Sequence, residues 1–203
     1  MKNNYIEFYL NKYEYIDSEE QLNINYIPPL TRRRLSQLDK FSLSTLNQCY
    51  NESIDNLVFA SKFGEIERLL KIISQYKNED GVSPAVFSGS VHNYNSGLFL
   101  LIKQKTIPYT AISAGEKTFS NGILASVISK NQNTLFCYTD LIEDKYVSLS
   151  MNLTKFPSNN SEHYRIIKNQ NKNTNDNLKN FIKLFEGKLQ TINADCFSLE
   201  RIK

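Results

Sequence analysis

The stretch Val86–Leu124, VFSGSVHNYNSGLFLLIKQKTIPYTAISAGEKTFSNGIL, decides the fold class of this chain. Its pattern predicts an apolar helix over His92–Gln104, a strand over Tyr109–Ala114 and a second helix over Thr118–Lys130. Pro108 precedes the strand, and the chain turns sharply from the strand into the following helix. A strand between two helices is typical of an α/β protein.

The rest of the chain extends this alternation. Strands are expected over Tyr5–Tyr15, Leu57–Ala60, Thr134–Thr139, Tyr146–Phe156 and Thr191–Ile202. Helices are expected over Thr31–Asn51, over the amphipathic Glu65–Tyr76, from Ser83-Pro84, and over Asn177–Leu184. Pro28-Pro29 should exclude regular structure, and the Asn-, Ser- and Lys-rich residues 157–177 should be the least ordered. The sequence therefore predicts one α/β domain over residues 1–203, with a mixed sheet and helices on both faces.

Composition indicates a soluble globular protein. Of 203 residues, 40% are hydrophobic and 22% are charged, and the net charge is +3. This charge is too small to indicate nucleic acid as a partner. No apolar run is long enough for a membrane span, and the N-terminus lacks a signal-peptide core, so a cytoplasmic location is expected.

The three cysteines do not indicate a metal site. Cys49 lies in a helical pattern, and Cys137 and Cys196 lie in strand patterns, without a CxxC spacing. They are expected to be small buried side chains in a reducing compartment. Neither a metal nor a cofactor is expected.

Four segments in order carry a resemblance to a known family. They are PPLTRRRLSQLDKFSL (28–43), VFASKFGE (58–65), SPAVFSGSVHNYNSGLF (83–99) and SAGEKTFSNGIL (113–124), followed by FIKLFEG (181–187). Together they resemble β-ketoacyl synthases of the thiolase superfamily. The resemblance is closest to short chain-length-factor-like proteins of aryl polyene and flexirubin-type pigment pathways, which look like the N-terminal half of a condensing enzyme. It implies a thiolase-like half-fold.

The same resemblance implies that the catalytic residues are absent. In the family, an Asn-x-x-x-Gly opens a helix, here Asn93 and Gly97, and the strand after Pro108 leads to a cysteine nucleophile. Counting in that register places Glu116 at the nucleophile position. A carboxylate cannot form the acyl thioester. Neither histidine of the sequence, His92 or His163, lies in a motif resembling the family's histidine loops, so no catalytic residue is expected.

Each matching residue has a functional and a purely structural interpretation. Glu116 is either a polar placeholder that accepts hydrogen bonds from the start of the next helix or a simple cap of that helix. His92 and Asn93 either line a pocket near a subunit contact or belong to a core hydrogen-bond network. Four apolar residues are expected to contact a tunnel or a partner, with plain core packing as the alternative: Phe87, Val91, Tyr94 and Leu98. Tyr109 and Ala111 are expected to contact a partner if their strand adds to that partner's sheet. Arg32, Arg33 and Arg34 either contact an acyl carrier protein or form a solvated helix face.

Three functions follow from these interpretations. The first is a non-catalytic chain-length-factor subunit that pairs with an active ketosynthase and shapes the tunnel in which a fatty-acid or polyene-type chain grows on acyl carrier protein. The second is a decarboxylase or hydrolase of carrier-protein thioesters that uses Glu116 and His92. The third is an interaction or regulatory domain. Product length, starter unit and the identity of the ketosynthase stay open.

Overall fold

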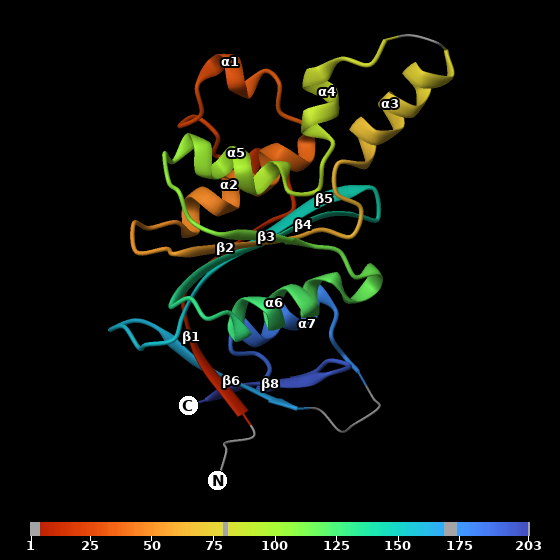
Figure 1. Cartoon of the computed structure of the whole chain (residues 1–203). Helices are drawn as coiled ribbons and strands as arrows, with labels where there is room; N and C mark the ends of the chain where they lie inside the picture. Colours follow the sequence, from red (N-terminus) through yellow and green to blue (C-terminus); the bar gives the residue numbers. More distant parts are fainter. Residues whose placement is uncertain (1–4, 79–80, 169–173, 203) are drawn as a thin grey trace.

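The computed structural model describes residues 5–78, 81–168 and 174–202 and contains one mixed sheet (Figure 1). In the described residues the strand order is β3-β2-β4-β5-β1-β6-β8-β7. The strands are β1 Tyr5–Ile16, β2 Asn56–Ala60, β3 Tyr109–Ile112, β4 Asn133–Ile142, β5 Lys145–Thr154, β6 Glu162–Lys168, β7 Thr191–Asn193 and β8 Phe197–Ile202. The helices are α1 Pro29–Arg32, α2 Gln37–Cys49, α3 Ile66–Lys77, α4 Pro84–Gly89, α5 Tyr94–Ile102, α6 Thr118–Ile128 and α7 Leu178–Phe185, with short 3₁₀ turns η1 Glu19–Gln21 and η2 Gly115–Lys117. The predicted α/β class with a mixed sheet is confirmed.

Helices cover both faces of the sheet. On one face, α2 and α5 pack over β2 and β4 through a buried cluster that includes Leu43, Leu46, Phe59, Phe99 and Leu135. On the other face, α6 and α7 lie between the central strands and β6–β8, and the curved sheet wraps round them (Figure 1). Alternate residues of each central strand point to opposite clusters, which explains why β2 is buried along its whole length.

Strands β2, β3 and β4 are parallel and form the part of the sheet that positions the candidate site. Leu57 pairs with Tyr109 on one side and with Leu135 on the other. Strand β3 is at the end of the strand order and, within the described residues, pairs only with β2. Because the three strands are parallel, their carboxyl ends meet at the same edge of the sheet.

The predicted helix over Thr31–Asn51 is wrong, because the chain forms two helices there. Helix α1 ends at Arg32, and α2 begins after Ser36. The Ser36 hydroxyl accepts a hydrogen bond from the Asp39 amide at 3.0 Å, and the Asp39 carboxylate accepts one from the Ser36 amide at 2.9 Å. This capping box starts a new helix. Pro28-Pro29 does not exclude regular structure either, because proline is compatible with the first turn of α1.

Two C-terminal predictions also need correction. The strand expected over Thr191–Ile202 is a hairpin of β7 and β8, and Cys196 lies exposed in its turn instead of in a buried strand. Within the segment expected to be least ordered, 162–168 form β6, which pairs with both β1 and β8. Residues 169–173 of that segment lie outside the described residues. The prediction from polar composition was wrong for β6, because only the inward-facing residues of a strand need to be apolar. In β6 these include Tyr164 and Ile166, which are buried.

In the described parts of the chain, none of the helices combines the length and apolar character required to cross a membrane.

The close approach of α6 to the sheet generates a testable prediction. A Cβ atom built on Gly122 would lie 2.5 Å from the Phe136 ring and 2.9 Å from the Ala60 Cβ. We expect Gly122→Ala to lower the free energy of unfolding by about 1–3 kcal/mol, despite the better helix propensity of alanine, because the added methyl overpacks the core. Urea unfolding measures the change. Gly81→Ala is the control, because a Cβ there meets nothing within 4 Å. Equal stability of the two variants would contradict this packing.

Candidate functional site: the strand-to-helix elbow after β3

The carboxyl end of β3 leads through the 3₁₀ turn η2 directly into α6. Gly115 adopts a φ of +58°, in the left-handed region that suits glycine, and so reverses the chain. Thr118 fixes the turn from inside, because its hydroxyl accepts a hydrogen bond from the Ala114 amide at 2.9 Å and donates one to the Gly115 carbonyl at 2.7 Å. We call residues 113–118 the elbow.

Glu116 lies within the elbow, as the sequence register predicts. Its side chain is 83% exposed, and its carboxylate pairs with the ammonium group of Lys62 from the loop after β2. The expected cap is not found: across the described elbow, neither η2 nor α6 has a side-chain cap, and Glu116 accepts from Lys62 instead of from backbone amides. The carboxylate therefore faces outward from the elbow.

A buried aspartate at the carboxyl end of β4 holds the loop that carries Lys62. The Asp140 carboxylate accepts hydrogen bonds from the Lys62 and Phe63 amides at 2.5 and 3.2 Å and from the Ser61 hydroxyl at 3.3 Å. Burial raises the pKa of Asp140, and these hydrogen bonds act in the opposite direction. Sequence reasoning missed Asp140, although a carboxylate directly after the predicted apolar strand Thr134–Thr139 is a usable signal.

His92 reaches the same edge from the segment between α4 and α5. One ring nitrogen, Nε2, lies 3.1 Å from the Ile112 carbonyl at the end of β3, and the other side of the ring faces Gly64. A Cβ on Gly64 would lie only 2.7 Å from Nδ1, so glycine there makes room for the ring. Asn93 is exposed at the start of α5 and makes no side-chain cap there. Different partners therefore hold His92 and Glu116.

The residues expected to contact a tunnel or partner differ in exposure. Phe87 of α4 is 61% exposed and Val91 43%. Tyr94 and Leu98 are half-buried. Helix α5 is not buried on nearly every side as its composition predicts, because Leu101 is exposed. A helix that is apolar all round thus has one face outside the protein's own core.

Tyr109 and Ala111 lie on β3, at the open edge of the sheet. The Pro108 and Ile112 carbonyls accept hydrogen bonds from the Leu57 and Ser61 amides of the β2 segment. Since alternate residues of a parallel strand bond to the same neighbour, the backbone groups of Tyr109 and Ala111 point away from β2.

The arginine run lies at the end of α1, away from the elbow. Arg32 donates to the Asn25 side-chain carbonyl at 2.9 Å, whereas the side chains of Arg33 and Arg34 are exposed. The Arg34 carbonyl accepts a hydrogen bond from Arg68 at 3.0 Å. Two of the three guanidinium groups are therefore available to an acidic surface.

A buried charged cluster of Asp39, Glu65 and Arg68 supports this side of the molecule and was missed by sequence reasoning. Arg68 pairs with Asp39 at 2.6 Å, its Nε atom lies 3.5 Å from the carboxyl group of Glu65, and both acidic side chains are almost fully buried. Arg68 also donates to the Gly89 carbonyl of α4 at 2.8 Å, and its guanidinium lies 5.0 Å from the centre of the Tyr94 ring. One arginine thus joins α2, α3, α4 and α5.

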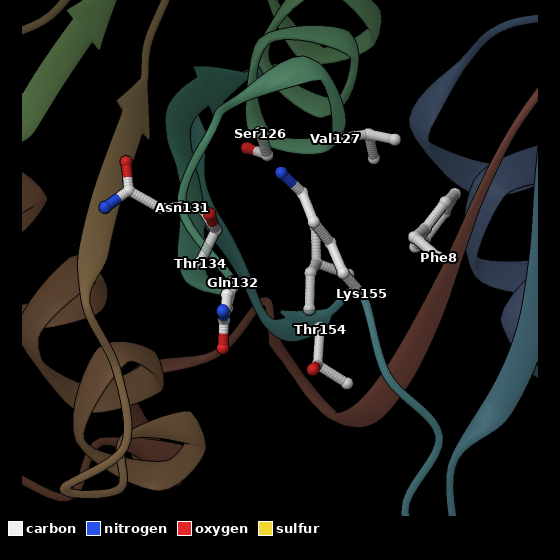
Figure 2. Close-up of a pocket in the computed structure, with 9 residues that line it drawn as sticks. Phe8, Ser126, Val127, Asn131, Gln132, Thr134, Thr154 and Lys155 are labelled. Atoms are coloured by element: carbon white, nitrogen blue, oxygen red, sulfur yellow. The ribbon is translucent and has the colours of Figure 1, made fainter.

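The pocket in Figure 2 lies at the opposite end of the central strands from the elbow. Its lining includes Ser126, Val127, Thr134 and Thr154, and the Lys155 side chain extends into it and donates to the Ser129 carbonyl. Its volume of about 10 Å³ is room for roughly one water molecule. It is therefore too small for a substrate.

The cysteines do not supply a nucleophile to the elbow. Cys49 and Cys137 are buried, and burial raises the pKa of both thiols, which keeps them protonated. Cys196 lies between β7 and β8. Across residues 5–78, 81–168 and 174–202, no group of three or more His, Cys, Asp or Glu side chains could hold a metal ion.

Comparison with known proteins identifies the class of protein to which this fold belongs. Residues 10–157 match the family model of the β-ketoacyl synthase N-terminal domain, which is more than half of the chain. The chain therefore belongs to the family of β-ketoacyl synthase N-terminal domains. The comparison with curated protein sequences gives no match.

Solved structures show the same fold at low sequence identity. A chain in the complex of the ketosynthase ApeO with its chain length factor ApeC from Xenorhabdus doucetiae is similar, with a TM-score of 0.67 and 17% identity, over 97% of this chain and 97% of that one. The ishigamide ketosynthase/chain length factor is also similar, with a TM-score of 0.51 and 11% identity, over 68% of this chain and 48% of that one. The predicted thiolase-like fold is confirmed.

The buried cluster generates a prediction for pH dependence. Burial, reinforced by the charge of Asp39 and opposed by Arg68, raises the pKa of Glu65 from 4.5 to about 8. The folded protein then keeps a proton that the unfolded chain releases, so this group's contribution to stability decreases as the pH rises from about 5 to 8. We expect Glu65→Gln to remove that decrease, measured as urea unfolding at several pH values. The exposed Glu20→Gln is the control, and an unchanged slope in Glu65→Gln would contradict the assignment.

Proposed function

We propose that this chain is a non-catalytic, chain-length-factor-like subunit that pairs with an active ketosynthase. The observation that carries the proposal is the carboxylate of Glu116 in the elbow, which the register of the sequence motif assigns to the family's nucleophile position. A carboxylate paired with Lys62 supplies neither the thiolate that accepts an acyl group nor a leaving group for the next step. The chemistry would then belong to the partner, and this chain would shape the space for the product.

The open edge of β3 supports pairing with another sheet. The outward backbone groups of Tyr109 and Ala111 form a short edge that has no partner strand among the described residues, and such edges add strands from another chain. The similar Xenorhabdus doucetiae structure is a ketosynthase in complex with its chain length factor, and the matched chain has nearly the same length as this one. We therefore assign the β3 edge to the contact with a ketosynthase subunit.

The exposed residues beside the elbow support a role in product length. Phe87 and Val91 lie on the segment that leads to His92, whose ring contacts the end of β3. In a complex formed through β3, bulk at Phe87 would face the tunnel of the partner and limit the growing chain. Arg33 and Arg34 are exposed and would meet the acidic surface of an acyl carrier protein. A cytoplasmic location fits this role.

The alternative enzyme, a decarboxylase or hydrolase of carrier-protein thioesters, receives less support. A general acid or base must reach the proton that it transfers, directly or through one water molecule. Here the carboxylate of Glu116 pairs with Lys62, and the His92 ring contacts a backbone carbonyl. The third candidate, an interaction domain without acyl chemistry, predicts no association with a ketosynthase.

Co-expression with the ketosynthase of the same genome tests the pairing. We expect a stable heterodimer, and we expect Ala111→Pro to weaken it at least about tenfold, because proline removes an outward N–H from the edge. Ala111→Ser keeps that N–H and is the control. Affinity by isothermal titration calorimetry measures the change, with thermal unfolding of each free variant as a check of folding. If the chain is soluble and folded but does not bind the ketosynthase, the proposed function is wrong.

The product of the assembled complex tests the role in chain length. We expect Phe87→Ala to shift the product distribution toward longer chains, because removing the ring lengthens the available tunnel. Mass spectrometry of the carrier-bound products measures the shift. Leu30→Ala is the control, since Leu30 is also exposed, on α1, but is not on the segment next to His92. An unchanged distribution for Phe87→Ala would contradict its place in the tunnel.

A further inference from the structure

Helix α3 has its apolar face outside the protein. Every residue of α3 is exposed or half-buried, and the large apolar side chains on its outer face are exposed by 45% for Leu69, 58% for Leu70, 42% for Ile73 and 79% for Tyr76. We call these four residues the α3 face. An amphipathic helix normally turns such a face toward its own core. Figure 1 shows α3 standing apart from the sheet beside α4.

Charged contacts fix this unusual orientation. The inward side of α3 carries Arg68, which pairs with the buried Asp39 at 2.6 Å and donates to the Gly89 carbonyl at 2.8 Å. A Cβ on Gly89 would lie 2.3 Å from the Arg68 guanidinium, so glycine at this position makes the contact possible. Glu67 accepts a further hydrogen bond from the Tyr146 hydroxyl at 2.8 Å. These contacts hold the helix in one rotation, with its apolar residues in solvent.

The geometry points to the α3 face as a second contact with the ketosynthase subunit, in addition to the β3 edge; this inference rests on the function proposed above. A stable interface buries about 800 Å² on each partner, and a four-residue edge strand supplies only part of that area. The α3 face adds large apolar side chains, and a fully buried tyrosine alone contributes about 150–250 Å². A contiguous exposed apolar surface of this kind marks a site of protein association.

The α3 face is connected to the β3 edge through the elbow. The loop before α3 is bound to the end of β3, because the Ser61 amide donates to the Ile112 carbonyl and the Ser113 hydroxyl donates to the Lys62 carbonyl, both at 3.1 Å. The loop that leads into α3 therefore lies directly against the end of β3, so one partner large enough to cover the β3 edge would lie next to the start of α3. This continuity favours the ketosynthase over a separate binding partner.

Charge placed on the α3 face tests the inference. We expect the double variant Leu70→Glu with Ile73→Glu to weaken binding to the co-expressed ketosynthase at least about tenfold in calorimetry, while the free variant keeps its thermal unfolding temperature because both side chains are exposed. Lys71→Glu lies on the same helix and changes the net charge by the same two units, so we expect it to bind like the wild type. Light scattering of the free wild-type chain accompanies the titration and should give a monomer.

The outcomes separate the two proposals. If the wild type binds the ketosynthase and the double variant binds equally well, the α3 face is not part of the contact and the proposed function stands. Equal losses for the double variant and for Lys71→Glu would show a general charge effect and would also overturn the inference. A free chain that self-associates, and that the double variant makes monomeric, would assign the face to a second copy. If the wild type binds no ketosynthase, both proposals fail.

Discussion

The ion pair between Arg68 and Asp39 is the interaction on which the packing of helices α2, α3, α4 and α5 depends. Asp39 is fully buried within the capping box that starts α2, and a buried carboxylate is costly unless a charge and hydrogen bonds compensate it. Arg68 supplies that compensation and, with its remaining donors, fixes α3 and α4. The outward orientation of the apolar side of α3 therefore follows from the pairing of Arg68, on the inward side of the helix, with the buried Asp39.

The elbow depends on a second buried carboxylate. Asp140 accepts two backbone amides of the loop after β2, and that loop brings Lys62 to Glu116. The parallel strands β2, β3 and β4 end at the same edge, so residues far apart in the sequence meet there. Here the scaffold presents a solvent-exposed ion pair, which is compatible with a supporting subunit.

Several elements were predictable because their signals are local. The parallel strands and the helix after the elbow follow from short apolar runs and from the proline before β3. The register of the motif placed Glu116 in the elbow without any coordinates. The division of α1 from α2 and the hairpin of β7 and β8 were missed, because a capping box at Ser36 and a turn at Cys196 interrupt patterns that are otherwise periodic.

The sequence by itself determined the α/β class, the family and the residue at the elbow, since these depend on patterns within some tens of residues. Only the tertiary structure decided that Asp39, Glu65 and Arg68 form one buried cluster, that Asp140 holds the Lys62 loop, and that the apolar side of α3 faces outward. The periodicity of a helix shows that it has an apolar side but not which way that side turns. That choice follows from long-range charge pairing, which no local pattern records.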